Sequence, residues 1–323
     1  MAQKLGFQQI SKHFLQEEAK KRWYTIETIH EGKNIFYVKN KDKSILFKWI
    51  DAGLTTRLGK YLSEDKLLTY MLLQHNNISI PECIVIHKKD KIDIAAIAKL
   101  WFPLVTKPLN GSLWRWVVVW IKNKTELLKA IHYNFGFDKH VIIQKYVEGK
   151  NLRVLVINHK VFACLEWTRH HIVWDGKSTI KTLLKKENLN PRRWKNILVS
   201  TLPKIIINEE LEEFFKVQYW YTLDYCPKEN EQIFLKGNGY TNVVDVTDTV
   251  PKNIKKACEQ VSKLFDLKVV GIDVIYSMSG LNKINFWILE ANSQPWIKTH
   301  HLPMEWKSRN VAWAILDLYF PKK

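Results

Sequence analysis

Two long apolar runs near the C-terminus contain acidic residues, although their pattern predicts strands in the interior of a sheet. The segments "LKVVGIDVIYS" and "KINFWILEANSQP" are separated by the polar turn "SMSGLNK", an arrangement that predicts an antiparallel hairpin. A turn centred between Gly280 and Leu281 would place Asp273 opposite Ile288, with Glu290 as its diagonal neighbour on the same face. Because a buried carboxylate without a partner is costly, this hairpin needs a positive charge beside it.

The next residue on that face is Asn292. Two carboxylates and an amide form an oxygen set suited to Mg²⁺, which prefers to bridge protein carboxylates and substrate phosphates. The pattern therefore predicts a metal site at Asp273, Glu290 and Asn292 for Mg²⁺, or Mn²⁺ in its place. From these residues alone, the alternative is that Asp273 pairs with a lysine or caps the turn.

The rest of the chain alternates helical and extended patterns, without repeats or low-complexity linkers, which predicts an α/β (α+β) fold. A second hairpin is expected about Asn158 and His159, and helices are expected from Ser63, with acidic residues in the first turn, and from a cap at Thr125. The other expected elements are a helix at 14–21 and strands at 24–30, 34–40, 44–50, 78–87, 102–109 and 140–149.

Charge and hydropathy argue against several classes of protein. The net charge is +18, but lysines are spread through every segment rather than clustered, so neither nucleic acid nor a membrane is an expected partner, and a basic nucleic-acid-binding protein is the less favoured alternative. The chain contains no apolar run approaching the ~20 residues of a membrane span. Its start lacks the apolar core of a signal peptide, so we expect a cytoplasmic protein.

The stretch "NGSLWRWVVVW" is unusual because a turn that opens with small residues continues with three tryptophans in seven positions. The whole chain has 14 Trp and only 12 Gly. Counted together they make about 8% of the residues, close to the ordinary glycine share of about 7%. This composition suggests that tryptophan stands where glycine is wanted.

An ordered series of motifs carries a resemblance: "FPLVTKPLNGS", "VIIQKYVEGKNLRVLVINHKVFA", "DGKSTIKTLL", "DVTD", "GIDVI" and "ILEANSQP". Over residues 63–323 the chain resembles the ATP-grasp ligases, specifically the ATP-grasp region of cyanophycin synthetase and the bifunctional glutathione synthetases. The resemblance implies two α+β lobes that grip ATP, at about 63–143 and 144–323, after a short N-terminal segment, 1–62. It also implies a ligase that activates a carboxylate as an acyl phosphate and joins it to an amine, with amino-acid or peptide substrates.

The resemblance assigns roles to particular positions. Arg153 and Lys298 match basic positions that stabilise the phosphoryl group in transfer, and Asp273, Glu290 and Asn292 match the metal-binding positions. Asn151 stands where the family has an acidic residue on the ribose. The remaining ATP-binding positions are Lys107, Gly111, Ser112, Trp114, Arg115 and Trp116 at the phosphates and Gln144, Lys145, Tyr146 and Val147 at the adenine.

The resemblance also interprets the tryptophans. Trp114 and Trp116 occupy glycine positions of the phosphate-covering loop, and Trp174 stands in "VWDGKST" for "VGDGKST". We infer that the source reads UGA as glycine, whereas the printed translation reads it as tryptophan.

The sequence leaves the oligomeric state open, including whether the protein is a homo-oligomer. Other departures from the family's pattern leave the identity of the substrates open. Tyr70 replaces a family lysine, Trp167 replaces an arginine, and "NGYT" at Asn238–Thr241 stands where the family has the small-residue loop "STGG". They also leave open a catalytically decayed ATP-binding protein or regulatory module.

Overall fold

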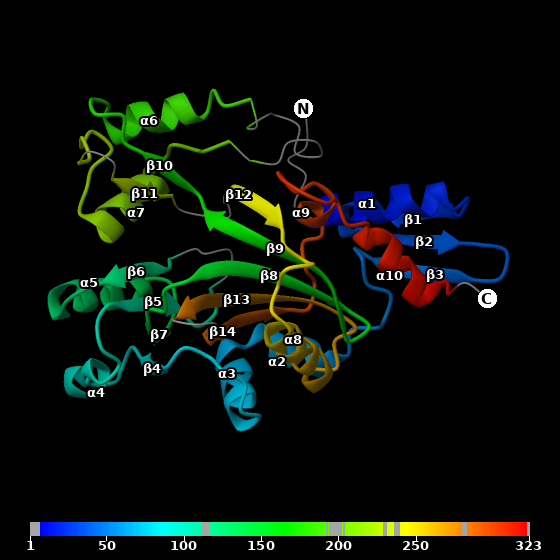
Figure 1. Cartoon of the computed structure of the whole chain (residues 1–323), viewed down its shortest axis with the longest axis horizontal. Coiled ribbons are helices and arrows are strands. Elements are labelled where there is room, and N and C mark those ends of the chain that lie inside the picture. Colours follow the sequence, from blue (N-terminus) through cyan, green and yellow to red (C-terminus); the bar gives the residue numbers. More distant parts are fainter. Residues whose placement is uncertain are drawn as a thin grey trace.

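The structure is a computed structural model in which the chain is described at residues 7–111, 116–191, 193, 202, 204–228, 231–235, 240–279 and 283–321. At its centre lies a five-stranded antiparallel sheet in the order β12-β9-β8-β13-β14 (Figure 1). The bounds are β8 Lys150–Ile157, β9 Lys160–Arg169, β12 Tyr240–Asp245, β13 Val269–Ser279 and β14 Lys283–Asn292.

The two faces of this sheet serve different purposes, because side chains alternate along each strand. On β8, Leu152, Val154 and Val156 are buried in a core shared with α3 (Lys66–His75) and α8 (Lys252–Leu264). The opposite face carries Arg153 and, further along the strand, apolar residues of a second core. One strand therefore presents an apolar layer on one side and a charged side chain on the other.

The N-terminal and C-terminal ends of the chain pack together over that second face. Leu155 and Ile157 share a core with Phe36, Phe47 and Ile315, which joins the three-stranded sheet β1-β2-β3 to the two terminal helices (Figure 1). The bounds are α1 Phe7–Lys21, β1 Thr25–His30, η1 Glu31–Lys33, β2 Ile35–Lys39, β3 Ser44–Lys48, α2 Arg57–Glu64, α9 Lys298–His301 and α10 Val311–Tyr319.

A four-stranded antiparallel sheet lies beside the central one, in the order β4-β7-β5-β6. Helix α5 covers it with Leu127 and Ile131, which pack in the core that contains Leu104 and Ile143. The bounds are β4 Cys83–His87, α4 Ile94–Ala98, β5 Leu104–Pro108, β6 Val118–Ile121, α5 Lys124–Phe135 and β7 His140–Lys145.

A small unit between β9 and β12 has its own core and contacts the four-stranded sheet. Its helix α7 places Gln218 beside the edge strand β6, where the side-chain amide accepts from the N–H of Val119 at 3.0 Å and donates to the carbonyl of Val119 at 2.7 Å. The bounds are β10 His171–Val173, α6 Ile180–Glu187, α7 Glu209–Tyr219 and β11 Gln232–Phe234.

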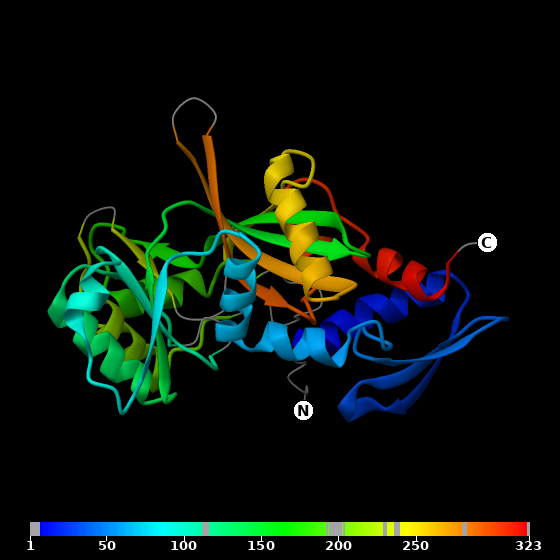
Figure 2. The same ribbon diagram turned by 90° about the horizontal axis from the view of Figure 1, so that it is seen from below.

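Both predicted hairpins form, but the register of the C-terminal one differs from the prediction. Asp273 lies opposite Glu290 rather than Ile288. The strands already pair one residue further along β14 than predicted, as Val274 with Ile288 shows, and an irregularity between Asp273 and Val274 then leaves Leu289 as an extra residue. Together the shifted turn and this β-bulge turn the expected diagonal pair of carboxylates into a direct cross-strand pair. The far end of the hairpin projects from the body of the molecule (Figure 2).

The helix boundaries also needed correction. The helix expected from Ser63 begins at Lys66, because the Asp65 side chain accepts hydrogen bonds from the N–H groups of Leu67 and Leu68 and so supplies the N-cap. Ser63 instead belongs to the preceding helix α2. Likewise, Asn123 rather than Thr125 caps α5.

Tryptophan occupies an unusual share of the left-handed backbone conformations. Seven of the twelve described tryptophans have φ between 60° and 72°, a region that bulky L-residues rarely adopt. Trp23 follows α1 and Trp220 ends α7, positions where glycine commonly terminates a helix. The seven are Trp23, Trp49, Trp101, Trp116, Trp120, Trp220 and Trp306.

None of the helices in the described part of the chain is both long enough and apolar enough to cross a bilayer.

Candidate functional site

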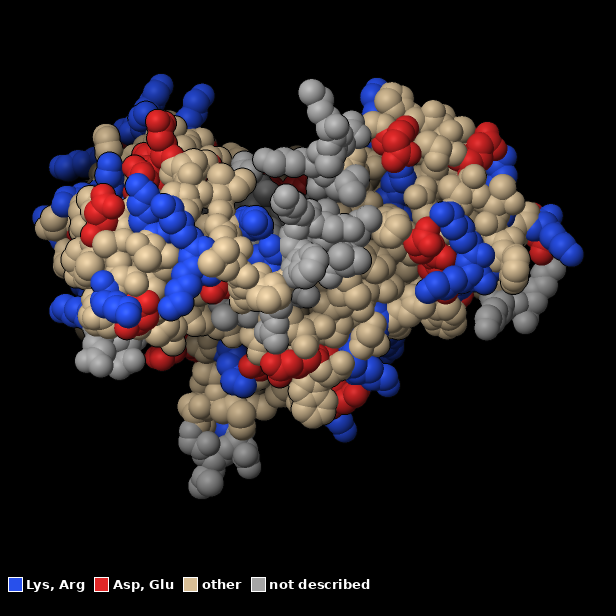
Figure 3. Space-filling model, turned by 90° about the horizontal axis from the view of Figure 1, so that it is seen from above, with Lys and Arg blue, Asp and Glu red and all other residues tan. Residues whose placement is uncertain are grey.

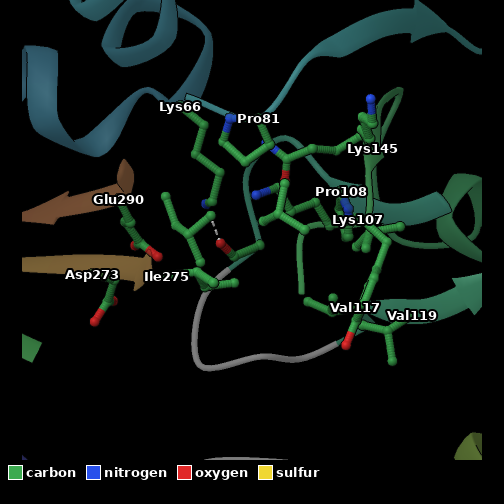
Figure 4. A pocket seen from close by; sticks show the side chains of 16 residues that line it. Lys66, Pro81, Lys107, Pro108, Val117, Val119, Lys145, Asp273, Ile275 and Glu290 are labelled. Atoms are coloured by element: carbon green, nitrogen blue, oxygen red, sulfur yellow. Dashed lines mark hydrogen bonds between the residues drawn. The ribbon is translucent and has the colours of Figure 1, made fainter. Parts of the chain in front are cut away.

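A cavity of about 120 Å³ lies between the four-stranded and the five-stranded sheets (Figure 4). It gathers residues that are far apart in sequence, from α3, β5, the segment that joins β7 to β8, and the β13–β14 hairpin. Lysines enter it from one side and carboxylates from the other. The lining residues are Lys66, Pro81, Val105, Lys107, Pro108, Gly111, Val117, Val119, Gln144, Lys145, Tyr146, Val147, Asp273, Ile275, Leu289 and Glu290.

Lys107, a predicted phosphate ligand, extends from β5 into this cavity. Its Nζ donates to the hydroxyl of Tyr70 at 2.7 Å, and the hydroxyl donates in turn to the carbonyl of Leu289 at 3.1 Å. The lysine is therefore fixed through one tyrosine to the residue that precedes Glu290.

Lys66 is a second cation in the cavity, and the sequence reasoning did not identify it. It lies one helical turn before Tyr70 on the same face of α3, and its Nζ donates to the carbonyls of Leu109 and Gly111 in the segment after β5. Burial lowers the pKa of Lys66, and the nearby Lys107 acts in the same direction, whereas Glu290 opposes it. The sequence signal that identifies Lys66 is its place four residues before Tyr70, the position where the resemblance expects a lysine.

Asp273 and Glu290 line the cavity from the β13–β14 hairpin (Figure 4). Burial raises the pKa of Asp273 to about 6, and Glu290 adds to this effect, while Arg153 opposes it. Arg153 Nε lies 2.8 Å from Asp273 Oδ1, and the amide of Asn292 is 3.4 Å from Asp273 Oδ2. Asp273 thus has a cationic partner, as its burial requires, but it is arginine and not the lysine considered from sequence.

Gly271 makes room for this arrangement. A Cβ at that position would lie 2.9 Å from Nη1 of Arg153 and 2.8 Å from Cβ of Pro295. A side chain there would displace the guanidinium from Asp273.

The end of β7 and the connection from it to β8 line the opposite end of the cavity. Gln144 is buried, and its Nε2 has no hydrogen-bond partner among the described residues. The N–H of Tyr146 donates to the carbonyl of Pro103 at 3.0 Å, so this N–H is already used within the protein. Lys145 and Val147 complete this end.

A second cavity, of about 740 Å³, continues from the first and shares Val119, Tyr146, Val147 and Ile275 with it. Asn151, at the start of β8, lines only this second cavity, opposite Trp167 on β9. The predicted ribose position therefore lies in the second cavity, on the strand residue that pairs with Ile275, which lines both cavities.

Some predicted positions do not meet at the first cavity. Lys298 is buried on α9, where burial lowers its pKa to about 8, and it does not line either cavity. The ring of Trp116 stacks on Phe137 with centroids 4.3 Å apart. The predicted loop positions Ser112, Trp114 and Arg115, and the departures Asn238 and Gly239, lie outside the described residues.

Comparison with known proteins agrees with this architecture. Residues 63–173 match the family model of a RimK-like ATP-grasp domain. Cyanophycin synthetase from Synechocystis sp. is 32% identical over 275 residues, which cover 82% of this chain and 31% of that protein. The bifunctional glutathione biosynthesis protein of Listeria welshimeri is 26% identical over 303 residues, 90% of this chain and 37% of that protein.

Among solved structures, a bifunctional glutathione synthetase from Pasteurella multocida matches with a TM-score of 0.62 and 21% identity, over 96% of this chain and 43% of that one. The fold is that of the ATP-grasp ligases. More particularly, residues 63–173 match a RimK-like ATP-grasp domain, and cyanophycin synthetases and bifunctional glutathione proteins are similar to the chain in sequence. It spans about a third of the length of these curated relatives.

Proposed function

We propose that this protein is an ATP-dependent carboxylate–amine ligase that forms an amide bond through an acyl-phosphate intermediate. The observation that carries the proposal is the first cavity, where Lys66 and Lys107 face Asp273 and Glu290 between two sheets. Such a space suits a polyphosphate, because the lysines offset its charge while the carboxylates hold a bridging divalent cation.

The residues present fit Mg²⁺ or Mn²⁺. Asp273 and Glu290 are paired across neighbouring strands, and their mutual repulsion contributes to the raised pKa of Asp273, so a divalent cation between them would relieve an unfavourable contact. When bound, the cation would neutralise charge on the phosphate oxygens. Asn292 is within reach of both carboxylates in one or the other amide orientation.

Gln144 supports the proposal of adenine at the other end of the cavity, because its Nε2 has no hydrogen-bond partner in the part of the chain that the structure describes. A buried polar group without a protein partner is costly, and an adenine edge offers the hydrogen-bonding atoms that would satisfy it. With adenine at that end, we propose Asn151, which lines the larger cavity, for the ribose and Lys107, which lines the first cavity, for the phosphates.

The proposed reaction has two steps. A carboxylate oxygen of the first substrate attacks the γ-phosphorus, the bond to the β-γ bridging oxygen breaks, and ADP leaves. The amine of the second substrate then attacks the acyl carbon, phosphate leaves with the electron pair of the C–O bond, and the nitrogen loses a proton. Arg153 is the described cation closest to Asp273 that could stabilise charge on the transferring group.

Release of ADP tests this function. Pairs of amino acids or dipeptides are supplied with ATP and Mg²⁺, and ADP, AMP and phosphate are measured together with the mass of the product. The proposal expects ADP and an amide product only when carboxylate and amine are both present. Release of AMP and pyrophosphate would contradict the acyl-phosphate route.

A separate proposal concerns the chain itself: the native protein carries glycine where the printed sequence has tryptophan. Its support is the left-handed conformation of seven described tryptophans, five of which also expose 45% or more of their surface. Glycine adopts this conformation without the steric cost borne by other residues. Sequencing TGA or TGG at the fourteen codons, with the intact mass of protein from its own host, decides between glycine and tryptophan.

The departures Tyr70 and Trp167 favour one alternative, an ATP-binding protein that no longer ligates. Saturable ATP binding without turnover on any substrate pair would support it.

The partners we propose are small amino-acid or peptide substrates in the cytoplasm, and not nucleic acid or a membrane. In support, Lys and Arg are interleaved with Asp and Glu on the face shown in Figure 3 rather than gathered in one patch.

A further inference from the structure

Tyr70 stands where the resemblance expects a second phosphate-binding lysine, yet it is integrated into the site. Only 2% of its surface is exposed, it packs in the core beneath the central sheet, and it does not line the nucleotide cavity. Its hydroxyl is the group that reaches the site, since it connects Lys107 on β5 with the carbonyl of Leu289 on β14.

These two contacts join the sheets on either side of the cavity. Leu289 is the extra residue of the β-bulge and directly precedes Glu290, so its carbonyl has a position set by the irregular register. A tyrosine hydroxyl can accept one hydrogen bond and donate another. It therefore accepts from the ammonium of Lys107 and donates to Leu289, which a lysine at position 70 could not do, because an ammonium has no acceptor.

The hydrogen bond to the Tyr70 hydroxyl also restricts the conformation of the lysine side chain. A flexible four-carbon side chain is thereby held in one conformation before any ligand enters. The ordering cost that a phosphate would otherwise meet at this side chain is reduced in advance.

We propose that Tyr70 is a positioning residue that presents Lys107 to the nucleotide phosphates in place of the missing lysine. Tyr70 contributes no charge of its own; it acts through Lys107. This inference rests on the proposed ATP binding. It gives a role to Tyr70, which otherwise marks only the loss of the lysine that the resemblance expects.

The test is a double-substitution cycle for ATP binding, measured by calorimetry on the full chain with the composition that the mass measurement establishes. Tyr70→Phe removes one oxygen from a buried side chain and keeps the ring. We expect it to weaken ATP binding about tenfold, to leave adenosine binding unchanged, and to have almost no further effect when Lys107→Met is already present. Tyr61→Phe, at an exposed tyrosine of α2, is the matched control and should change nothing.

Each outcome is informative. Additive effects of Tyr70→Phe and Lys107→Met would overturn the positioning role, because residues that act independently contribute independently. Equal loss of ATP and adenosine binding would also overturn it, since it would show a general change in the fold of the site. If the unsubstituted chain binds ATP and the cycle is additive, only the role of Tyr70 is wrong; if it does not bind ATP at all, the proposed function fails as well.

Discussion

Replacing exposed left-handed tryptophans by glycine should stabilise the printed chain. Trp23, Trp101 and Trp306 are 95%, 74% and 84% exposed, with φ of 61°, 61° and 72°. The left-handed conformation costs an L-residue about 1–2 kcal/mol of stability, and glycine avoids this cost. Glycine in turn loses about 0.5–1 kcal/mol of stability, because it makes the unfolded chain more flexible. With little burial to lose, the net gain is about 0.5–1 kcal/mol at each position, or about 2 kcal/mol for all three.

The assay compares two triple variants with the printed chain by urea denaturation. The glycine triple should gain about 2 kcal/mol of unfolding free energy, whereas an alanine triple should gain almost nothing, because alanine loses the indole but keeps the unfavourable φ. The comparison separates backbone strain from the loss of an exposed aromatic ring. If glycine and alanine prove equally stable at these positions, the reasoning from φ is wrong.

Four further results are expected. Lys66→Met should weaken ATP binding about tenfold while Lys60→Met, at a lysine of α2 whose side chain is 44% exposed, leaves it unchanged; equal effects would exclude Lys66 as a phosphate ligand. Glu290→Gln should lower turnover by at least about tenfold without altering the melting temperature, and full turnover at ordinary Mg²⁺ would remove Glu290 from the metal site. Chelation by EDTA should stop ADP release, and Mg²⁺ or Mn²⁺ should restore it; turnover that persists in EDTA contradicts a metal requirement. Arg309→Met should cost about 3 kcal/mol of unfolding free energy, because it leaves the buried Asp245 without the guanidinium that contacts both its oxygens at 2.9 and 3.0 Å, and thermal unfolding measures that loss.

Local patterns in the sequence were sufficient for most of the elements that build the cavity. Apolar runs on either side of a polar turn located both strands of the C-terminal hairpin, and the hairpin expected about Asn158 and His159 includes the strand that carries Arg153. The pairing of Asp273 with Glu290 was not predictable, because the number of residues between two strands does not reveal where an extra residue will be accommodated. The face shared by the two carboxylates was right, and their relative position was wrong.

Other features depend on contacts that no single segment contains. Both Ser63 and Asp65 are suitable N-cap residues from their sequence alone. In the structure Asp65 is the residue that ends α2 and begins α3. Lys66 enters the cavity because α3 lies against the segment after β5, a tertiary relation between residues more than forty positions apart. The resemblance indicates only that Tyr70 replaces a lysine. The connection of its hydroxyl to Lys107 is visible only in the hydrogen bonds of the structure.

The contact of Gln218 with Val119 also bears on how the protein avoids self-association. Strand β6 is the outer strand of its sheet, and an open edge of this kind is a template on which another chain can add a strand and begin aggregation. Here a side-chain amide occupies one donor and one acceptor of that edge. Gln218 thus imitates the next strand and blocks its addition, which makes Gln218→Ala a change whose consequence would be sought in light scattering and solubility.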